Sequence, residues 1–116
     1  MQSIKPEYQS SFDIFDMLIS STLSLNTLEV NVLAKTMDST NATEIKAALK
    51  ELDLQGRERA IIDTAGVQFI DSSGIGALLS FYEKMNQKLT LKSPLQTMLS
   101  VLELLRLHRI LAIEPE

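Results

Sequence analysis

Residues 60–79 read AIIDTAGVQFIDSSGIGALL, and this stretch says most about the fold. Its beginning belongs to a segment, residues 59–64, in which Ile61 and Ile62 indicate a short buried strand. Its end opens an apolar stripe at helical spacing that continues to about Asn86 (Ile75, Leu78, Leu79, Tyr82 and Met85). The stretch therefore predicts a strand, a connection over residues 65–71 and a helix.

Two strands are predicted upstream of this stretch. The segment from Phe12 to Ile19 is mostly apolar and ends at a polar cluster, which favours a strand over a helix (Ser20, Ser21 and Thr22). The second strand is indicated by β-branched and apolar residues at alternate positions, and this pattern stops at Lys35 (Leu28, Val30 and Val32).

A helix is predicted between these strands and residue 59. Residues 38–41 are of types that hydrogen-bond their own backbone, and Glu44 stands where the acid of a capping box would lie. Four apolar residues then recur at helical spacing, and Gly56 follows as a left-handed cap (Ile45, Ala48, Leu49 and Leu52).

The C-terminal part predicts a strand, a helix and a last strand. Leu89–Leu91 indicates a short strand, and Ser93, Pro94 and Gln96 suit an N-cap, a first-turn proline and a capping-box partner. An apolar stripe follows, before a strand near residues 110–113 (Leu95, Met98, Leu99, Leu102 and Leu105). Two leading strands followed by alternating helices and strands predict a small α/β domain, with helices packed on a mixed sheet.

Composition sets limits on domain number and chemistry. The chain has 116 residues, 45% hydrophobic and 22% charged, which suits one core. We expect residues 1–11 to form a mobile tail and residues 12–116 to form one domain. A net charge of −4 disfavours nucleic acid or an anionic membrane as the main partner. With no Cys and one His, disulfides, cysteine-ligated zinc and sites with two imidazoles are excluded, and we expect no metal or cofactor.

The N-terminus has neither the basic flank nor the continuous apolar run of a signal peptide. No apolar run approaches the roughly 18 residues that span a bilayer. We therefore expect a cytoplasmic protein that does not insert into membranes.

The junction before the second helix is the most unusual part of the chain. Ser72 suits an N-cap whose hydroxyl accepts from the amide of Gly74 or Ile75. Gly74 and Gly76 within the first turns indicate that something approaches the backbone closely, either a partner or a packing neighbour. A phosphate on Ser72 would lie at the positive end of the helix, so the fold would tolerate it, whereas a partner surface fitted to the hydroxyl would not.

The predicted outward face of this helix carries small or apolar residues (Ser73, Ala77 and Ser80, with Lys84 and a flanking Phe81). Exposed helix faces usually carry long charged residues, so this face resembles a surface where another protein docks. The alternative is that the N-terminal segment covers part of it.

The chain resembles STAS domains, in particular the bacterial anti-sigma factor antagonists. The resemblance is carried by residues 60–79, by the run Met37 to Ala42, and by SPLQTMLSVLELLRLHRIL near the C-terminus. It extends over about residues 28–114. Three loops differ from the usual pattern: Lys35–Met37 replaces a segment with glycine, Asn86–Lys88 replaces a glycine-rich turn, and Arg106 and His108 replace glycine and aspartate.

The resemblance implies a switch between partners. The serine after the aspartate of the DSSG motif, here Ser72, would be phosphorylated, with Ser73 as the neighbouring alternative. Asp38 would contact an anti-sigma serine kinase. The unphosphorylated domain would bind this kinase and free a sigma factor, phosphorylation would release it, and a metal-dependent serine/threonine phosphatase would reset it. The implied partner surface comprises Asp38, Ser39, Asp71, Ser73, Gly74, Gly76, Ala77, Ser80 and Phe81.

Other functions fit the residues less well. An enzyme would need Ser72 as nucleophile and His108 as base, with one aspartate to orient the base (Asp63, Asp71 or Asp38). Ser72 lacks the flanking glycines of a hydrolase nucleophile elbow, and a cation at His108 suits a helix C-terminus. Gly74 and Gly76 are only a fragment of a dinucleotide fingerprint, and the basic residues form no continuous run.

The serious alternative is a STAS module that packs on the ATPase of a lipid or solute ABC transporter. The intact sequence Asp71-Ser72-Ser73-Gly74 favours the phosphorylation switch instead.

Overall fold

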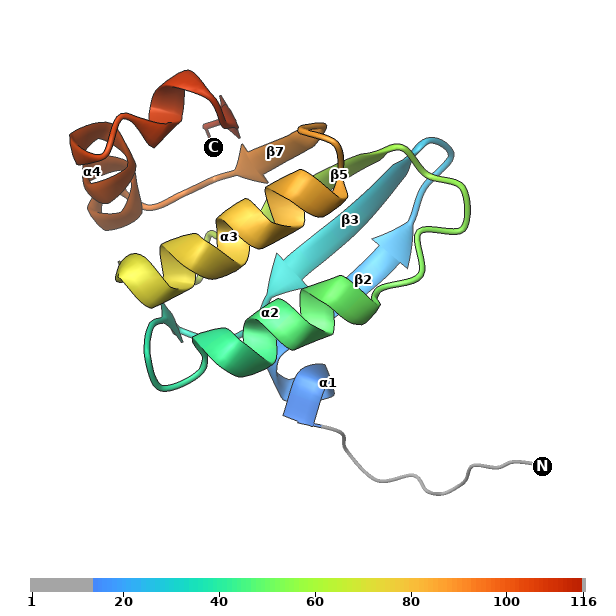
Figure 1. Ribbon diagram of the computed structural model, residues 1–116, viewed down its shortest axis with the longest axis horizontal. Coiled ribbons are helices and arrows are strands. Elements are labelled where there is room, and N and C mark those ends of the chain that lie inside the picture. Colours follow the sequence, from blue (N-terminus) through green and yellow to red (C-terminus); the bar gives the residue numbers. More distant parts are fainter. Residues whose placement is uncertain (1–13, 116) are drawn as a thin grey trace.

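The computed structural model describes residues 14–115 (Figure 1). The predicted tail, residues 1–11, lies outside the described residues. The elements in chain order are α1 (Ile14–Leu18), β2 (Ile19–Leu23), β3 (Thr27–Val32), β4 (Thr36–Met37), α2 (Ala42–Glu51), β5 (Arg59–Asp63), β6 (Phe69–Ile70), α3 (Ser72–Lys84), β7 (Leu89–Lys92), α4 (Gln96–Leu104), the 3-10 helix η1 (Leu107–Arg109) and β8 (Ala112–Glu114).

A five-stranded mixed sheet in the order β2-β3-β5-β7-β8 is the centre of the fold. β2 runs antiparallel to β3, and the other neighbours in this sheet are parallel. α2 and α3 lie side by side on one face, and α4 lies beyond β7 (Figure 1). The predicted fold class, helices packed on a mixed sheet, is confirmed.

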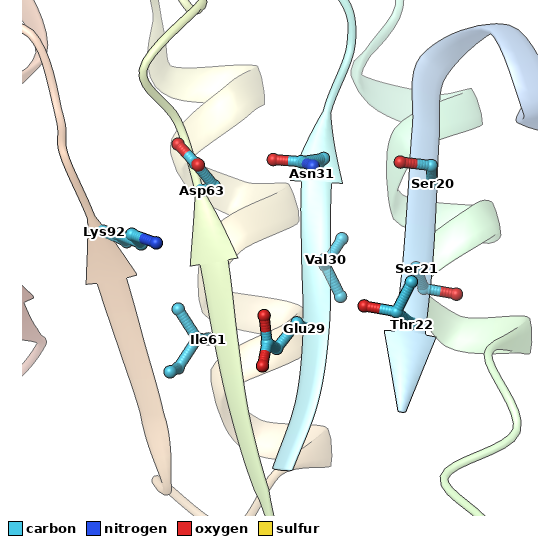
Figure 2. A pocket seen from close by; sticks show the side chains of 9 residues that line it. All are labelled: Ser20, Ser21, Thr22, Glu29, Val30, Asn31, Ile61, Asp63 and Lys92. Carbon is cyan, nitrogen blue, oxygen red and sulfur yellow. The ribbon is translucent and has the colours of Figure 1, made fainter. Parts of the chain in front are cut away.

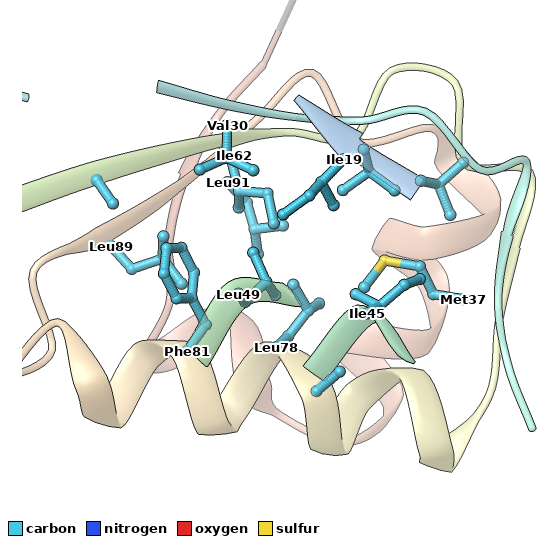
Figure 3. Packing of buried hydrophobic residues seen from close by; sticks show 14 of the residues in the cluster. Ile19, Val30, Met37, Ile45, Leu49, Ile62, Leu78, Phe81, Leu89 and Leu91 are labelled. Atoms are coloured by element: carbon cyan, nitrogen blue, oxygen red, sulfur yellow. The ribbon is translucent and has the colours of Figure 1, made fainter. Parts of the chain in front are cut away.

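The core fills the space between this sheet and the helices α2 and α3 (Figure 3). Alternate residues of each inner strand point into it, which is the expected consequence of strand geometry. The strands contribute Leu28, Val30, Val32, Ala60, Ile62, Leu89 and Leu91, and the helices contribute Ile45, Ala48, Leu49, Ile75, Leu78 and Phe81. The opposite face of the sheet is open, and polar side chains such as Asn31, Asp63 and Lys92 line a shallow hollow there (Figure 2).

The first predicted strand is wrong in its position. Residues 14–18 form the short helix α1, and the strand β2 consists of Ile19 and the polar cluster that we read as its end. β2 lies at the edge of the sheet, where its polar side chains remain in water, so alternation of apolar residues is not required there. The other predicted strands are confirmed as β3, β5 and β7, and the last begins at Ala112, after η1.

Two predicted helix caps are wrong, and a third has the predicted position without the capping bond. Ser93 does not cap α4: it has a left-handed φ of 55°, its N–H donates to the carbonyl of Glu114 at 2.7 Å, and α4 begins at Gln96. Gly56 has the predicted left-handed φ, 83°, but it belongs to a separate turn beyond the end of α2. α2 does begin after Asn41, and residues 38–41 hydrogen-bond their own backbone as predicted, but the Asn41 side chain makes no cap bond.

Non-glycine residues occupy left-handed backbone at positions where the resemblance implies glycine. Asn86, Gln87 and Arg106 have φ values of 52°, 70° and 62°. An L-residue in this conformation costs roughly 1–2 kcal/mol, because Cβ crowds the following carbonyl oxygen. These residues therefore adopt the left-handed backbone conformation that glycine favours.

Arg106→Gly should therefore stabilise the protein by about 0.5–1 kcal/mol, because the relief of Cβ strain exceeds the entropy cost of glycine. The change would appear as a higher midpoint of urea unfolding. Arg109→Gly is the matched control, since Arg109 lies in η1 without a positive φ and should lose stability. Equal destabilisation by both substitutions would contradict the strain argument.

Candidate functional site

Two loops distant in the sequence are joined by a small second sheet. β4 pairs in parallel with β6, so that Thr36 lies beside Phe69 and Met37 beside Ile70. The pairing extends in both directions, because the N–H of Gln68 donates to the carbonyl of Lys35 at 2.7 Å and that of Asp71 to Met37 at 3.2 Å. Residues 38–41 and the first turn of α3 are thereby held together.

Asp71 forms the N-cap of α3 and a link between the two loops. Its Oδ1 accepts from the N–H of Ser73 at 2.8 Å and of Gly74 at 3.2 Å. Its Oδ2 accepts from the N–H of Ser39 at 3.3 Å. The predicted cap, Ser72, is instead the first residue of the helix, so that prediction is wrong by one residue. Aspartate and serine are equally good N-caps, so local sequence could not choose between them.

The two glycines of this helix have different surroundings. A Cβ on Gly74 would collide with the carbonyl oxygen of Met37 and lie 2.8 Å from Cγ1 of Ile70. A Cβ on Gly76 would meet no atom within 4 Å. The close backbone approach predicted for this junction is therefore a packing contact at Gly74, while Gly76 is exposed and leaves an open, small surface.

Asp38 lies on the loop that Asp71 holds in place. Its Oδ1 accepts from the hydroxyl of Thr40 and, at 3.0 Å, from the N–H of Thr40. These bonds, the hydroxyl first, lower the pKa of the Asp38 carboxyl below its usual 3.8, so Asp38 is anionic at neutral pH. Asn41 completes the loop, because its Oδ1 accepts from the N–H of Asp38 at 3.1 Å and its Nδ2 donates to the carbonyl of Thr36 at 2.8 Å.

The predicted surface residues divide into three groups by exposure. Ser39, Ser72, Ser73 and Gly76 are exposed, and Asp38, Asp71 and Ser80 are half-buried. Ala77 and Phe81, by contrast, are 1% and 2% exposed and belong to the core, and Gly74 is buried against Met37, so the prediction of these three as docking residues is wrong. Ala77 and Phe81 belong to the core cluster, and the Phe81 ring points from α3 toward the sheet (Figure 3). The N-terminal segment that was the alternative cover for this face lies outside the described residues.

Lys84 also differs from its predicted place on a docking face. Its ammonium donates to three carbonyls at the end of α2, those of Leu49, Lys50 and Leu52, at 2.7–2.9 Å. Burial lowers the pKa of Lys84, while the charge of Asp53 acts in the opposite direction. Lys84 thus binds the free C-terminal carbonyls of the neighbouring helix.

Phe69, an exposed aromatic residue beside the two loops, was missed by the sequence analysis. It precedes Asp71 by two positions, and the residue is 54% exposed. Leu95, 37% exposed, lies on the adjoining segment, where the hydroxyl of Thr97 donates to the carbonyl of Gln68 at 3.1 Å. The sequence around Val67 and Phe69 does not predict which side chain is exposed, because β6 has only two residues and shows no alternating pattern. An exposed aromatic ring beside a candidate binding loop is a typical anchor for a partner.

Among residues 14–115, Ser72, His108 and the candidate aspartates form no hydrogen-bonded triad. His108 lies exposed on η1, and among residues 14–115 no hydrogen bond links it to Asp38, Asp63 or Asp71. The described residues contain no cluster of three His, Cys, Asp or Glu side chains suited to a metal ion. No helix in the same part of the chain is long and apolar enough to cross a membrane.

Fold and site together define a small α/β domain that presents an exposed serine at a helix N-terminus, beside an anionic loop. The STAS domain family model matches residues 29–116, and the chain belongs to this family. A search of curated proteins gives no sequence match.

Solved structures show the same fold at low sequence identity. TM1081 of Thermotoga maritima, assigned as an anti-sigma factor antagonist, has a TM-score of 0.73 and 19% identity, over 90% of this chain and 92% of that chain. The unphosphorylated form of SpoIIAA, an anti-sigma factor antagonist from Bacillus, has a TM-score of 0.62 and 18% identity, over 84% and 88%. A sulfate transporter family protein from Wolinella succinogenes has a TM-score of 0.66 and 17% identity, over 81% of each chain.

Proposed function

We propose that this protein is a cytoplasmic anti-sigma factor antagonist regulated by phosphorylation of Ser72. In the unphosphorylated form it binds an anti-sigma serine kinase, and phosphorylation by that kinase releases it. A metal-dependent serine/threonine phosphatase returns it to the binding form. The domain acts as a ligand and a substrate, with Ser73 as the alternative acceptor.

The observation that carries this proposal is that Asp71 caps α3, which leaves the neighbouring Ser72 hydroxyl without a structural role. Both carboxylate oxygens of Asp71 accept backbone amides, which completes the cap of α3 and holds the loop of Ser39. Ser72 is therefore not needed for the cap. Its side chain is exposed, and among residues 14–115 its hydroxyl has no hydrogen-bond partner. A kinase can reach this hydroxyl without opening the fold.

A phosphate at Ser72 would change binding more than folding. It would add a charge of about −1.5 to −2 at the positive end of a helix, where anions are stabilised. A partner that fits the hydroxyl would face this new charge beside the carboxylate of Asp38. Placing like charges together, or stripping a phosphate of water, costs several kcal/mol in an interface. This asymmetry supports a binding switch.

Phe69 should be an anchor of the same interface. Phe69→Ala should weaken kinase binding by about tenfold or more, since buried aromatic anchors contribute about 2 kcal/mol or more. The unfolding midpoint should stay nearly constant, because the ring is already exposed. Leu104→Ala is the control: Leu104 is 82% exposed on α4 and should have no effect on binding. Calorimetric titration would measure both variants, and equal losses would argue against this interface.

A paired pull-down from a lysate of the source organism tests the proposal. Wild-type protein and Ser72→Asp serve as baits, and mass spectrometry identifies the captured proteins. We expect a serine-kinase-type ATPase on the wild-type bait and its loss from Ser72→Asp. Ser72→Ala extends the test: normal kinase binding with continued phosphorylation would show that Ser72 is not the acceptor.

The second candidate function is a structural STAS module of a transporter, which the likeness to the sulfate transporter family protein brings forward. In that case transporter subunits, such as those of an ABC-type lipid or solute transporter, would be retained by both baits. Ser72 would then be an ordinary first-turn residue of α3.

A further inference from the structure

The edge strand β2 has features that its role in the monomer does not explain. It is the outermost strand of the five-stranded sheet, and four of its five residues are exposed. Its sequence, ISSTL, contains no charge and no proline. Proteins usually protect such edges with lysine, proline, bulges or a covering element, because unpaired backbone groups recruit other strands.

The hydrogen bonds around β2 show which of its backbone groups have no partner within residues 14–115. The N–H of Leu33 donates to the carbonyl of Leu18 at 2.7 Å, and the N–H of Ser24 donates to Thr27 at 2.9 Å. In an antiparallel pair the bonded residues alternate, so Ser20 and Thr22 direct their backbone groups toward β3. The N–H and C=O groups of the remaining residues therefore point away from the sheet (Ile19, Ser21 and Leu23).

The order of residues in β2 is nearly the same in both directions around Ser21. If two copies of β2 pair antiparallel with Ser21 on the two-fold axis, Ile19 lies opposite Leu23 of the other copy, and Ser20 lies opposite Thr22. On the helix side Ile19 then meets Leu23 at both ends of the pair, with the two Ser21 side chains between them. On the open side Ser20 meets Thr22. Figure 2 shows the serine and threonine side chains of β2 in the monomer. This register uses the outward N–H and C=O groups, because Ser21 would form a hydrogen-bonded pair with Ser21 of the second copy.

A hollow beside β2 offers space for the facing side chain. It has a volume of about 480 Å³ and is lined by the apolar residues Ile19, Ala48 and Leu52, together with Asp16, Glu51 and the serines of β2. In the two-fold arrangement the Leu23 of the second copy faces Ile19, at the border of this hollow. Leu23 is 36% exposed in the monomer, so pairing would remove apolar surface from water on both sides.

We propose that two copies of this chain associate through antiparallel pairing of their β2 edges, forming a continuous ten-stranded sheet. The uncharged strand sets no like charges against each other across the two-fold axis. A strand of five residues buries less than the roughly 1,200–2,000 Å² of a stable interface, so the dimer is weak and concentration-dependent. The pairing does not involve Ser72, the first residue of α3, or Asp38, which lies in the loop between β4 and α2. Neither residue belongs to β2 or to its partner strand β3.

Sedimentation velocity of the full chain at increasing concentration tests this proposal. We expect wild-type protein to shift from monomer to dimer between micromolar and millimolar concentration. Ser21→Lys and Ser21→Glu each place like charges on the two-fold axis and should weaken dimerisation by about fivefold or more. Neither change removes a hydrogen bond of the monomer. Ala112→Lys at the opposite edge, on β8, is the matched control and should dimerise like wild type.

Mixing the two charged variants gives a result that misfolding cannot produce. An equimolar mixture of Ser21→Lys and Ser21→Glu should recover the dimer, because opposite charges then meet on the axis. A wild-type protein that stays monomeric over the whole range would overturn the proposal. So would a Ser21→Lys variant that dimerises as tightly as Ala112→Lys.

Discussion

Phe81→Ala should lower the free energy of unfolding by about 3–5 kcal/mol, the usual cost of emptying a large aromatic site in a core. The ring is 2% exposed and lies between α3 and the sheet, close to Leu89 of β7 (Figure 3). Its removal leaves a cavity that the strand cannot close without breaking its pairing with β5. Urea unfolding followed by circular dichroism would measure the loss.

Phe69→Ala is the control for this prediction, because the same side chain is removed from an exposed site. Its effect should stay within about 0.5 kcal/mol. A small loss for Phe81→Ala, together with weaker kinase binding, would restore the docking face inferred from sequence and contradict the observed rotation of α3.

Gly74→Ala should destabilise the protein by about 1–3 kcal/mol, the usual cost of adding a methyl group to a packed site. The new Cβ meets the carbonyl oxygen of Met37, which is backbone and cannot rotate away. Relief of this clash would separate β4 from α3 and break the bond from Asp71 N–H to Met37. Because that bond helps to hold the two loops together, partner binding should weaken as well.

Gly76→Ala should have the opposite effect and stabilise the protein by about 0.5–1 kcal/mol, because alanine favours a helix and the site is open. The two variants carry the same substitution two residues apart in one helix. Thermal unfolding of both variants would measure the difference in stability. Similar changes in both variants would show that Gly74 does not make the close contact.

Much of the fold could be predicted from sequence because the inner strands and helices have regular patterns. Val30 and Ile62 lie in runs whose apolar residues face a single core, and such runs have one interpretation. β2 was misplaced because an edge strand needs no apolar alternation, so its serines were read as a boundary. The rotation of α3 was missed because apolar residues cover more than half of its circumference, and periodicity alone gives no unique buried side.

The sequence predicted where the candidate site lies, but not the hydrogen bonds and strand pairing that hold it together. The aspartate-serine junction pointed to a capped helix start, while the choice of Asp71 as cap depends on three-dimensional geometry. The bond from Ser39 to Asp71 joins residues 32 positions apart, and the pairing of β4 with β6 involves two residues in each strand. Such short or distant contacts leave no periodic signal. The exposure of Phe69 depends on these contacts, so it could not be predicted from the sequence either.

The central claim is that phosphorylation of Ser72 itself controls binding to one kinase. The most direct test incubates the purified protein with the captured kinase and ATP, maps the modified residue by tandem mass spectrometry, and compares the affinities of the two purified forms. We predict a single phosphoryl group on Ser72 and a loss of affinity of about tenfold or more. Modification at another residue, or equal affinity of the two forms, would contradict this account.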